Sequence, residues 1–570
     1  MIGVIPKAHQ EGVVEEFFEL FKTPWELYRP GRTYDVLIAT ADETPEIDAK
    51  LLLAYGPATK GMDARLGIVA GRRRQRATLT GLDSSLPIYG ELLTFAGGGE
   101  GIGCVTESSE AAGLKVSSSG STVIRLGYDL FDEVQVLLSV GQPFEHAHIP
   151  TLEIHIRMLR EWILDAGTPL LEIPPIPGGH SFIACLTHDI DFVGIRNHCL
   201  DHSMWGFVYR ATVGALQNFL RGRISWTRLF KSWVSAASLP LVYAGWARDF
   251  WEPFEWYLET EKGLPTSYFL IPFKRRPGEN VPGPHASRRA TAYDVSDLPH
   301  RTEVLRKRGC ELGVHGIDAW HSADKGRDEL MTIAAVTGES SIGIRMHWLL
   351  RDANTPSTLE LAGYAYDSTF GYNETVGYRA GTSQVFRPIG AQKLLELPLH
   401  IQDGALFYPQ RLDLSEPEAE KRCQALIDNA LKFGGVLTLL WHDRSHGPER
   451  FWGDFYVRLL QKLRSLDVWF GAAGQVIGWF RKRRDVRFER VEDGVGARPQ
   501  LRYEGEEIQP PLRIRVYLPP RSSKGDELGG EATVEFIDVP WNGKCIDELK
   551  LQAASQLSAT VLNVAGPSLS

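Results

Sequence analysis

The stretch that decides the fold is FIACLTHDID, residues 182–191. Its first half, residues 182–186, is a short apolar run, which is typical of a strand buried in a parallel sheet. The run is followed at once by a histidine and two acids, His188, Asp189 and Asp191. Because α/β proteins place their active sites at the carboxyl ends of parallel strands, this stretch predicts both a sheet and a site.

Six further apolar runs follow along the chain, and helix-like stretches such as 328–336 and 417–432 lie between several of them. The runs are residues 266–271, 311–314, 342–346, 364–366, 394–397 and 436–441. Strand-like runs with helical connections predict parallel βα units. Their number is close to that of a TIM-type barrel, which we expect over residues 181–484.

Reactive side chains stand at or just after five of these runs. They are Asp189 and Asp191, His315, Arg345, Asp367 and His442. Since the carboxyl ends of the strands share one rim of a parallel barrel, we expect these side chains to meet there. Each of these residues, taken alone, could serve only in packing. Five runs with such residues at the same rim nevertheless indicate a functional site.

The acids and histidines include a candidate metal-ligand set. Asp189, Asp191, His315 and His321 combine carboxylate oxygens with imidazole nitrogens. Two histidines and one carboxylate are common ligands of catalytic zinc or a similar divalent ion, and they leave positions open for water and substrate. We therefore predict a divalent metal, with Zn²⁺ the expected ion, and no other cofactor.

Five motifs occur in a recognisable order: LTHDID at 186–191, HGIDAWH at 315–321, RMHW at 345–348, YDST at 366–369 and LTLLWH at 437–442. In this order they resemble the motifs of the polysaccharide deacetylase (NodB-homology) superfamily, carbohydrate esterase family 4. The resemblance covers about residues 181–450. It implies a distorted (β/α)7 barrel and the metal-dependent removal of an acetyl group from an N-acetylated sugar.

The resemblance also implies a role for each matching residue. Asp189 is the expected general base, oriented by Arg345, and His442 is the expected general acid, supported by Asp367. The expected metal ligands are Asp191, His315 and His321. These parts suit amide hydrolysis, which needs an activated water, an electrophile for the developing oxyanion and a proton for the leaving amine.

The motifs also depart from the family pattern. One residue separates the acids of the first motif, so we expect Asp189 and Asp191 to point to opposite sides of the backbone, one as base and one as ligand. The histidines of the second motif stand six residues apart, so a loop must bring His321 to the metal, and Asp318 could replace it. His347 stands where a proline is usual and is another candidate ligand or substrate contact.

The barrel carries an insertion, residues 192–263, that is rich in tryptophan and arginine. A helical insertion packed on the barrel is one interpretation. Aromatic and basic residues together also suit sugar stacking or an anionic membrane surface. We hypothesise a lid or docking element for a lipid-linked or phosphorylated glycan, with peripheral membrane contact through residues 205–256.

The segments on either side of the predicted barrel differ from it in their pattern of apolar and polar residues. Residues 1–150 are expected to form an N-terminal α/β domain of unknown role, and residues 151–180 a helix and a proline-rich linker. Residues 485–570 alternate apolar and polar positions and predict a small C-terminal β domain. Its tail, from residue 553, lacks charge and is expected to be mobile.

The composition excludes some classes of protein. The chain has 570 residues, 62 basic against 71 acidic, and a formal charge of −9, which does not favour a nucleic-acid partner. The six cysteines are scattered without paired spacing. The sequence MIGVIPKAHQ lacks the features of an export signal, so we expect a cytoplasmic protein, peripheral to the inner membrane if the insertion docks.

The sequence therefore predicts a metal-dependent deacetylase that acts on an N-acetylated amino sugar of a surface polysaccharide or its precursor. Two alternatives stay open. One is a degenerate barrel that serves as a carbohydrate-binding or scaffold protein, and the other is a hydrolase of a non-sugar C–N bond.

Overall fold

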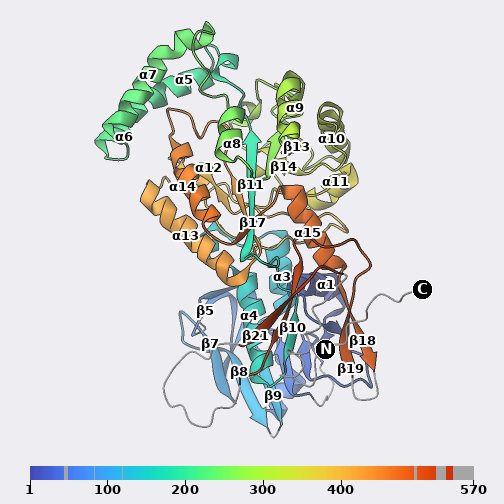
Figure 1. Cartoon of the computed structure of the whole chain (residues 1–570). Coiled ribbons are helices and arrows are strands. Elements are labelled where there is room, and N and C mark those ends of the chain that lie inside the picture. Colours follow the sequence, from blue (N-terminus) through green and yellow to red (C-terminus); the bar gives the residue numbers. More distant parts are fainter. Residues whose placement is uncertain (44–48, 82–83, 119, 493–496, 521–534, 544–570) are drawn as a thin grey trace, which may run out of the picture. The chain divides into compact units, whose positions relative to one another are not determined.

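The computed structural model describes all residues except 44–48, 82–83, 119, 493–496, 521–534 and 544–570, so the predicted tail lies outside the described residues (Figure 1). The chain divides into two compact units. One unit comprises residues 1–179, 380–389 and 478–570, and the other comprises residues 180–379 and 390–477.

The second unit is built around a parallel sheet. Its strands are β11 (Phe182–Ile190), β12 (Thr266–Leu270), β13 (Glu311–Gly316), β14 (Ile344–Met346), β15 (Ile401–Gln402), β16 (Val436–Leu440) and β17 (Val468–Phe470). They lie in the order β14-β13-β12-β11-β16-β15, and β17 also pairs with β11. All these pairs are parallel. Every residue of β11 is buried, which explains the apolar run over its first half, and the parallel pairs confirm the predicted parallel α/β arrangement.

Two isolated bridges extend the parallel pairing beyond β14. Asp367 bridges β14 on one side and Glu396 on the other. The segment that begins at Glu396 also contains β15, whose Ile401 pairs with β16. The parallel pairings therefore lead from β14 back to β16. The predicted runs 364–366 and 394–397 lie along this path but are not regular strands.

Helices lie between most of these strands. They are α8 (Phe254–Thr260), α9 (Pro299–Lys307), α10 (Ala323–Thr337), α11 (Thr355–Ala362), α12 (Asp403–Phe407), α13 (Glu416–Phe433) and α14 (Trp452–Arg464). The sequence of α13 contains the signals that begin and end a helix. Ser415 and Glu418 form a capping box at its start, and Gly434 ends it at a positive φ of 77°. The residues that α13 buries recur at helical spacing, from Ala419 to Ala430.

The insertion is a helical hairpin that stands out from the barrel (Figure 1, upper left). It comprises α5 (His202–Tyr209), the π-helical turn η4 (Arg210–Gly214), α6 (Ala215–Leu220) and α7 (Trp226–Tyr243). Phe207, Leu239 and Trp251 belong to a small apolar core of its own. Arg228 ties the hairpin to the barrel through Glu416 of α13, at 2.5 Å, and Asp454 of α14, at 2.7 Å.

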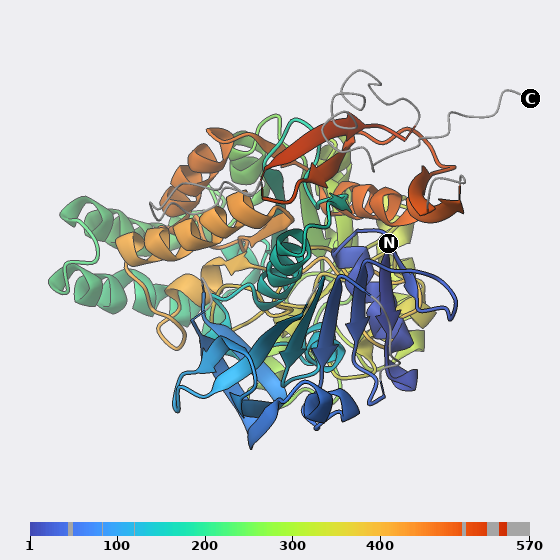
Figure 2. The ribbon, with the colours of Figure 1, turned by 90° about the horizontal axis from the view of Figure 1, so that it is seen from below.

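The first unit holds a nine-stranded mixed sheet, seen in Figure 2 in blue. Its strands are β1 (Ile2–Ile5), β2 (Trp25–Leu27), β3 (Val36–Ala39), β4 (Leu51–Tyr55), β5 (Val69–Thr80), β6 (Leu86–Gly97), β7 (Glu100–Val105), β8 (Ala111–Ser118) and β9 (Ser121–Leu126). The order is β2-β1-β3-β4-β9-β8-β6-β5-β7. The strands from β2 to β9 pair in parallel, and those from β9 to β7 pair antiparallel.

Four helices, α1 (Glu11–Leu20), α2 (Gly61–Arg65), α3 (Leu130–Ser139) and α4 (Thr151–Asp165), belong to the same unit. So do two small antiparallel groups of strands. β10 (Leu170–Glu172), β20 (Leu512–Tyr517) and β21 (Phe536–Trp541) form one, and β18 (Arg487–Glu492) with β19 (Ala497–Arg502) forms the other. Helix α15 (Ala473–Asp485) spans the boundary between the two units. In the described part of the chain, no helix has the length and apolar character needed to cross a membrane.

Candidate active site

A cavity of about 670 Å³ opens at the carboxyl ends of the parallel strands. Its walls include Asp189 from β11, His315 from β13 and His442, which follows β16. Asp191 and His347, just past β11 and β14, line it too. Acids and histidines at the strand ends therefore line a single cavity, where the sequence predicts a site.

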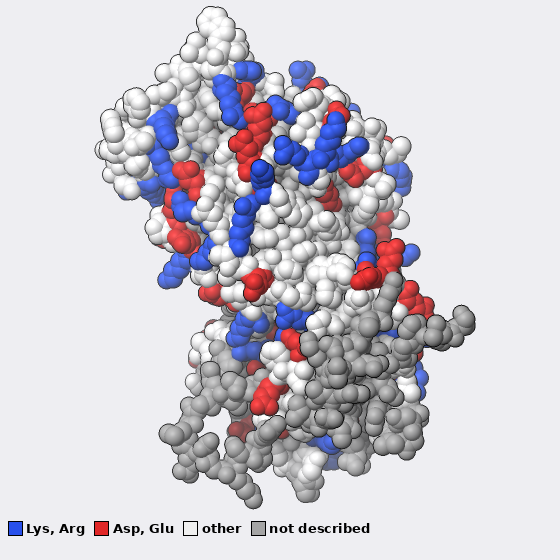
Figure 3. All heavy atoms as spheres, in the orientation of Figure 1, with Lys and Arg blue, Asp and Glu red and all other residues white. Residues whose placement is uncertain are grey.

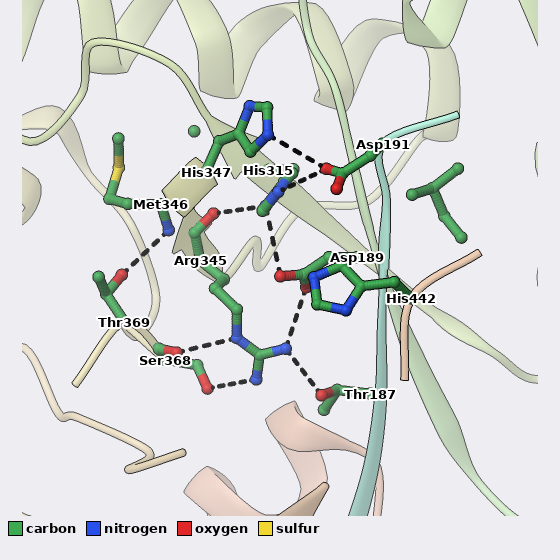
Figure 4. Close-up of polar contacts among 12 residues, drawn as sticks. Thr187, Asp189, Asp191, His315, Arg345, Met346, His347, Ser368, Thr369 and His442 are labelled. Carbon is green, nitrogen blue, oxygen red and sulfur yellow. Dashed lines mark hydrogen bonds and ion pairs between the residues drawn. The ribbon is translucent and has the colours of Figure 1, made fainter. Parts of the chain in front are cut away.

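Asp189 is hydrogen-bonded to a buried arginine, Arg345 (Figure 4). Nη1 of Arg345 donates to Oδ1 of Asp189 at 3.0 Å and to the hydroxyl of Thr187 at 2.7 Å. Nε and Nη2 of Arg345 donate to the carbonyl and hydroxyl of Ser368 at 2.9 and 2.8 Å. Because Arg345 is fully buried and has these fixed partners, it fixes the orientation of the Asp189 carboxylate.

Asp191, His315 and His347 form a group that could hold a metal ion, with ligand atoms all within 4.8 Å of one another. Oδ1 of Asp191 lies 3.2 Å from Nε2 of His315 and 3.3 Å from Nε2 of His347. This oxygen is buried and has no hydrogen-bond partner among the described residues. A buried carboxylate oxygen beside two imidazole nitrogens suits a divalent cation.

The surroundings prepare the two histidines for this role. Nδ1 of His315 lies 3.0 Å from the carbonyl oxygen of Arg345, so a proton on Nδ1 leaves Nε2 free to bind a metal. Burial lowers the pKa of His347 well below its ordinary value, which keeps the ring neutral, as a metal ligand must be. Burial opposes the charge of Asp191, but the adjacent His347 and His315 hold its pKa well below its usual range.

Asp189 and Asp191 face the same imidazole, so the expectation that they point to opposite sides is wrong. Oδ2 of Asp189 lies 3.8 Å from Nδ1 of His315, and Oδ1 of Asp191 lies 3.2 Å from its Nε2. The physical reason is the period of an extended chain, in which residues two positions apart share a face. The candidate base and the candidate ligand are therefore neighbours.

The structure does not bring His321 to the group of candidate ligands. Its Nε2 lies 3.2 Å from Oδ1 of Asp318, and the backbone of that loop is fixed by Glu329, which accepts the Asp318 N–H at 2.7 Å. His347 takes the third position because β13 and β14 are neighbours, with His315 paired to Arg345. Asp318, the other alternative, also lies outside the group.

His442 is paired with Asp403 rather than with Asp367. Nδ1 of His442 lies 2.6 Å from Oδ1 of Asp403, and its backbone N–H donates to Oδ2 at 2.8 Å. Burial opposes protonation of the ring, but the Asp403 carboxylate raises the pKa of His442 to about 10. His442 is therefore an imidazolium at neutral pH and can donate a proton.

Asp367 has other partners. Its carboxylate accepts the N–H of Thr369 at 3.0 Å as well as the Thr369 hydroxyl, and burial raises its pKa. The prediction that Asp367 supports His442 fails because Asp367 lies between β14 and Glu396, in the bridge that extends the sheet. Asp403 directly follows β15 (Ile401–Gln402), which is too short to give a sequence signal for a strand end.

Two further ionisable groups belong to this region. Oδ1 of Asp443 accepts the backbone N–H of Asp191 at 3.2 Å, and burial raises the pKa of Asp443 to about 7. His188 is completely buried, with Nδ1 2.8 Å from the Trp441 carbonyl and Nε2 2.8 Å from Glu261. These contacts give His188 a structural role, because both of its ring nitrogens are occupied by other parts of the barrel.

Comparison with known proteins gives matches among solved structures, whereas no family model and no curated protein matches the chain. A probable polysaccharide deacetylase from Pseudomonas aeruginosa PAO1 matches with 15% identity and a TM-score of 0.32, covering 56% of this chain and 97% of that one. Agd3, described as a novel carbohydrate deacetylase, matches with 10% identity and a TM-score of 0.35, covering 95% of this chain and 99% of that one.

Two of the matched structures are therefore of proteins described as deacetylases. Puue allantoinase also matches, with 14% identity and a TM-score of 0.33, covering 53% of this chain and 91% of that one. At such identities the roles of individual residues follow from the geometry of this cavity and not from alignment.

Proposed function

We propose that this chain is a metal-dependent hydrolase that removes an acetyl group from an N-acetylated amino sugar of a surface polysaccharide or its precursor. One observation carries the proposal. A single cavity holds a candidate base, Asp189, a candidate metal group around Asp191, and a candidate acid, His442. These are the parts that hydrolysis of an unactivated amide needs. The parallel pairings that lead from β14 back to β16 support a distorted (β/α)7 barrel as the scaffold.

The candidate metal group fits a divalent ion, and we expect Zn²⁺. Oδ1 of Asp191 and the two Nε2 atoms of His315 and His347 would hold it. Two imidazoles and one carboxylate form a donor set that is common for catalytic zinc. When bound, the ion supplies a Lewis acid for the acetyl carbonyl and for water.

The chain's own residues account for the proton transfers. Asp189, kept oriented by Arg345, accepts a proton from the attacking water. His442, protonated because of Asp403, gives its proton to the nitrogen of the leaving amine as the C–N bond breaks. The products are acetate and a free amino sugar. A positioned base and a positioned acid contribute about 10²- to 10⁴-fold each to such reactions.

Acetate release tests the proposal. Purified protein is stripped with a chelator, reloaded with Zn²⁺ and assayed on N-acetylglucosamine oligomers. We expect release only after reloading, and a loss of at least about 100-fold in Asp189→Asn and His442→Ala. His321→Ala is the matched control and should keep its activity. Full activity in Asp189→Asn with unchanged circular dichroism would refute the assigned role.

The same assay separates the two alternatives. Glycan binding without acetate release from any acetylated sugar, in metal-loaded protein, would favour a carbohydrate-binding or scaffold protein. Hydrolysis of cyclic or linear non-sugar amides, without release from sugars, would favour a hydrolase of a non-sugar C–N bond. Both outcomes would count against the deacetylase.

We also propose that the helical hairpin contacts an anionic membrane surface. Its exposed side chains include large apolar ones, with Trp226 58% and Leu220 75% exposed, and Trp246, just after α7, is 83% exposed. Residues 202–248 contain six arginines and lysines and no acid, although the whole chain carries a charge of −9. In Figure 3 the tip of the hairpin is mostly white, with blue side chains. Apolar and aromatic side chains beside cations are typical of helices that lie in an anionic interface.

Liposome sedimentation tests the membrane contact. We expect the full chain to bind vesicles that contain phosphatidylglycerol more tightly than vesicles of phosphatidylcholine alone. The double variant Trp226→Ser/Trp246→Ser should lose most of this binding. Leu361→Ser, which removes an apolar side chain 69% exposed on α11, is the control. Equal binding of the double variant and the wild type would contradict the proposal.

A further inference from the structure

Four arginines line the cavity of the candidate active site and take no part in the proposed reaction. They are Arg210, Arg411, Arg444 and Arg450. Arg210 comes from the π-helical turn of the insertion, Arg411 follows α12, and the other two lie between β16 and α14. Separate segments of the chain thus bring positive charge to one wall.

The arginines of this wall have unused donors. Arg450 is buried, with 4% of its side chain exposed, yet its Nε has no hydrogen-bond partner among the described residues. Nε and Nη2 of Arg210 are likewise buried and without a partner in the described part of the chain. The nearest acid to Arg450 is Glu449, whose Oε1 lies 4.0 Å from Nε. Buried charged donors without partners are costly and call for a ligand.

Arg289, which lines the same cavity, has a structural role. The guanidinium of Arg289 donates to the carbonyl oxygens of Gly316, Ile317 and His347 at 2.8 to 3.2 Å. Its donors are therefore occupied by the protein itself. Arg210 and Arg450 differ, because buried N–H groups of their guanidinium groups have no hydrogen-bond partner among the described residues.

Aromatic rings hold the guanidinium groups from their flat faces. The guanidinium carbon of Arg444 lies 3.5 Å from the ring centre of Phe192 and 4.9 Å from that of Trp251. The guanidinium carbon of Arg450 lies 4.7 Å from the ring centre of Trp452. Stacking on a face leaves the N–H edges of a guanidinium available for an anion.

Arginines of this wall repel one another, since Arg450 and Arg444 both act on Arg210. Glu449 lies 4.0 Å from Arg450 and Asp443 lies 4.0 Å from Arg444, and the charges of Glu374 and Asp403 act on Arg411. Oε1 of Glu449 is already hydrogen-bonded to Nε1 of Trp251 at 3.0 Å. Burial together with Arg450 lowers the pKa of Arg210 to about 10. A dianion would relieve this repulsion.

We propose that the arginine wall binds a phosphate or diphosphate group, so that the preferred substrate is a phosphorylated N-acetylated sugar. The planar fork of arginine matches phosphate oxygens with two parallel hydrogen bonds, and several arginines suit a multiply charged oxyanion better than a single carboxylate. This assignment rests on the proposed deacetylation for the sugar part of the substrate. The anion site itself is independent of that reaction.

Binding of inorganic pyrophosphate tests the anion site directly. Isothermal titration of the full chain should show binding. Arg210→Gln and Arg450→Gln should each weaken binding by about tenfold or more. Arg450→Lys should bind more tightly than Arg450→Gln because it keeps the charge. Arg327→Gln, at an exposed position on α10, is the control.

Substrate preference gives the second measurement. We expect kcat/KM for N-acetylglucosamine 1-phosphate to exceed that for N-acetylglucosamine by about tenfold or more, and Arg210→Gln to remove most of the difference. Nucleotide-linked and lipid-diphosphate sugars, assayed beside them, identify the source of the phosphate. No pyrophosphate binding by the wild type, or equal kcat/KM for both sugars, would overturn the anion site. Pyrophosphate binding without acetate release from any sugar would instead refute the deacetylase.

Discussion

Nδ1 of His442 lies 2.6 Å from Oδ1 of Asp403, and the other oxygen of that carboxylate accepts the His442 backbone N–H at 2.8 Å. The contact joins the end of β16 to the start of α12. Asp403 is fully buried, so water does not screen its charge. The pairing fixes both the orientation and the protonation of the candidate acid.

Replacing Asp403 with asparagine should lower the pKa of His442. The Asp403 carboxylate raises that pKa to about 10 against the effect of burial. Without this charge, the pKa should fall to its ordinary value of ~6.5 or below. Since the acid must be protonated to act, the basic limb of the kcat/KM profile should move to lower pH by several units in Asp403→Asn. Asp367→Asn is the control, and an unmoved limb in Asp403→Asn would contradict the assignment.

His347 should matter for metal binding and His321 should not. His347→Ala removes one of three candidate ligands. Because even a partner outside the ligand set contributes ~10- to 100-fold to metal affinity, the loss of a ligand should cost at least about 100-fold. Competition with a chromophoric chelator measures the zinc affinity of both variants. Equal affinities in His347→Ala and His321→Ala would show that the third ligand lies elsewhere.

Arg345→Met should destabilise the barrel unit. It leaves the buried Asp189 carboxylate without its ion pair, a change that typically costs ~3–5 kcal/mol. The double variant Asp189→Asn/Arg345→Met removes the orphaned charge and should recover part of this loss. Urea unfolding at pH 7 measures both. Arg345→Met as stable as the wild type would mean that Asp189 is solvated or already neutral.

His155 should make the stability of the first unit depend on pH. Burial lowers its pKa to about 3 in the folded chain, whereas the unfolded value is ~6.5. The folded state thus binds fewer protons, so stability is fully present above ~6.5 and is lost as pH falls, by about 1.4 kcal/mol per unit. His155→Phe should flatten the decline in unfolding free energy between pH 7 and 5. Identical slopes in the variant and the wild type would contradict the burial of a neutral imidazole.

Much of the barrel could be predicted because its signals are local. The sequence of β11 is an apolar run followed by acidic residues. Helix α13 has a capping box, an apolar face and a terminal glycine within its own sequence. The mixed sheet of the first unit was not predicted in detail. Its order places β9 beside β4, so its pairings join segments distant in sequence, and such pairings leave no local pattern.

The site residues at strand ends could be predicted, whereas those whose position depends on the path of a loop could not. Asp189, Asp191, His315, Arg345 and His442 lie where strand ends predict. His321 lies apart because its loop turns toward Asp318, and spacing in sequence does not determine the path of a loop. Asp403 was missed because the strand before it is only two residues long, β15, and has too few residues to show a period.

The most direct test of the central claim is a crystal structure of the chain soaked in Zn²⁺, with anomalous scattering recorded at the zinc edge. We predict one strong peak within bonding distance, ~2.0–2.2 Å, of Asp191 Oδ1 and the Nε2 atoms of His315 and His347. The same peak should vanish in His347→Ala. A peak at His321 and Asp318, or none in the cavity at saturating zinc, would contradict a metal-dependent hydrolase built on these residues.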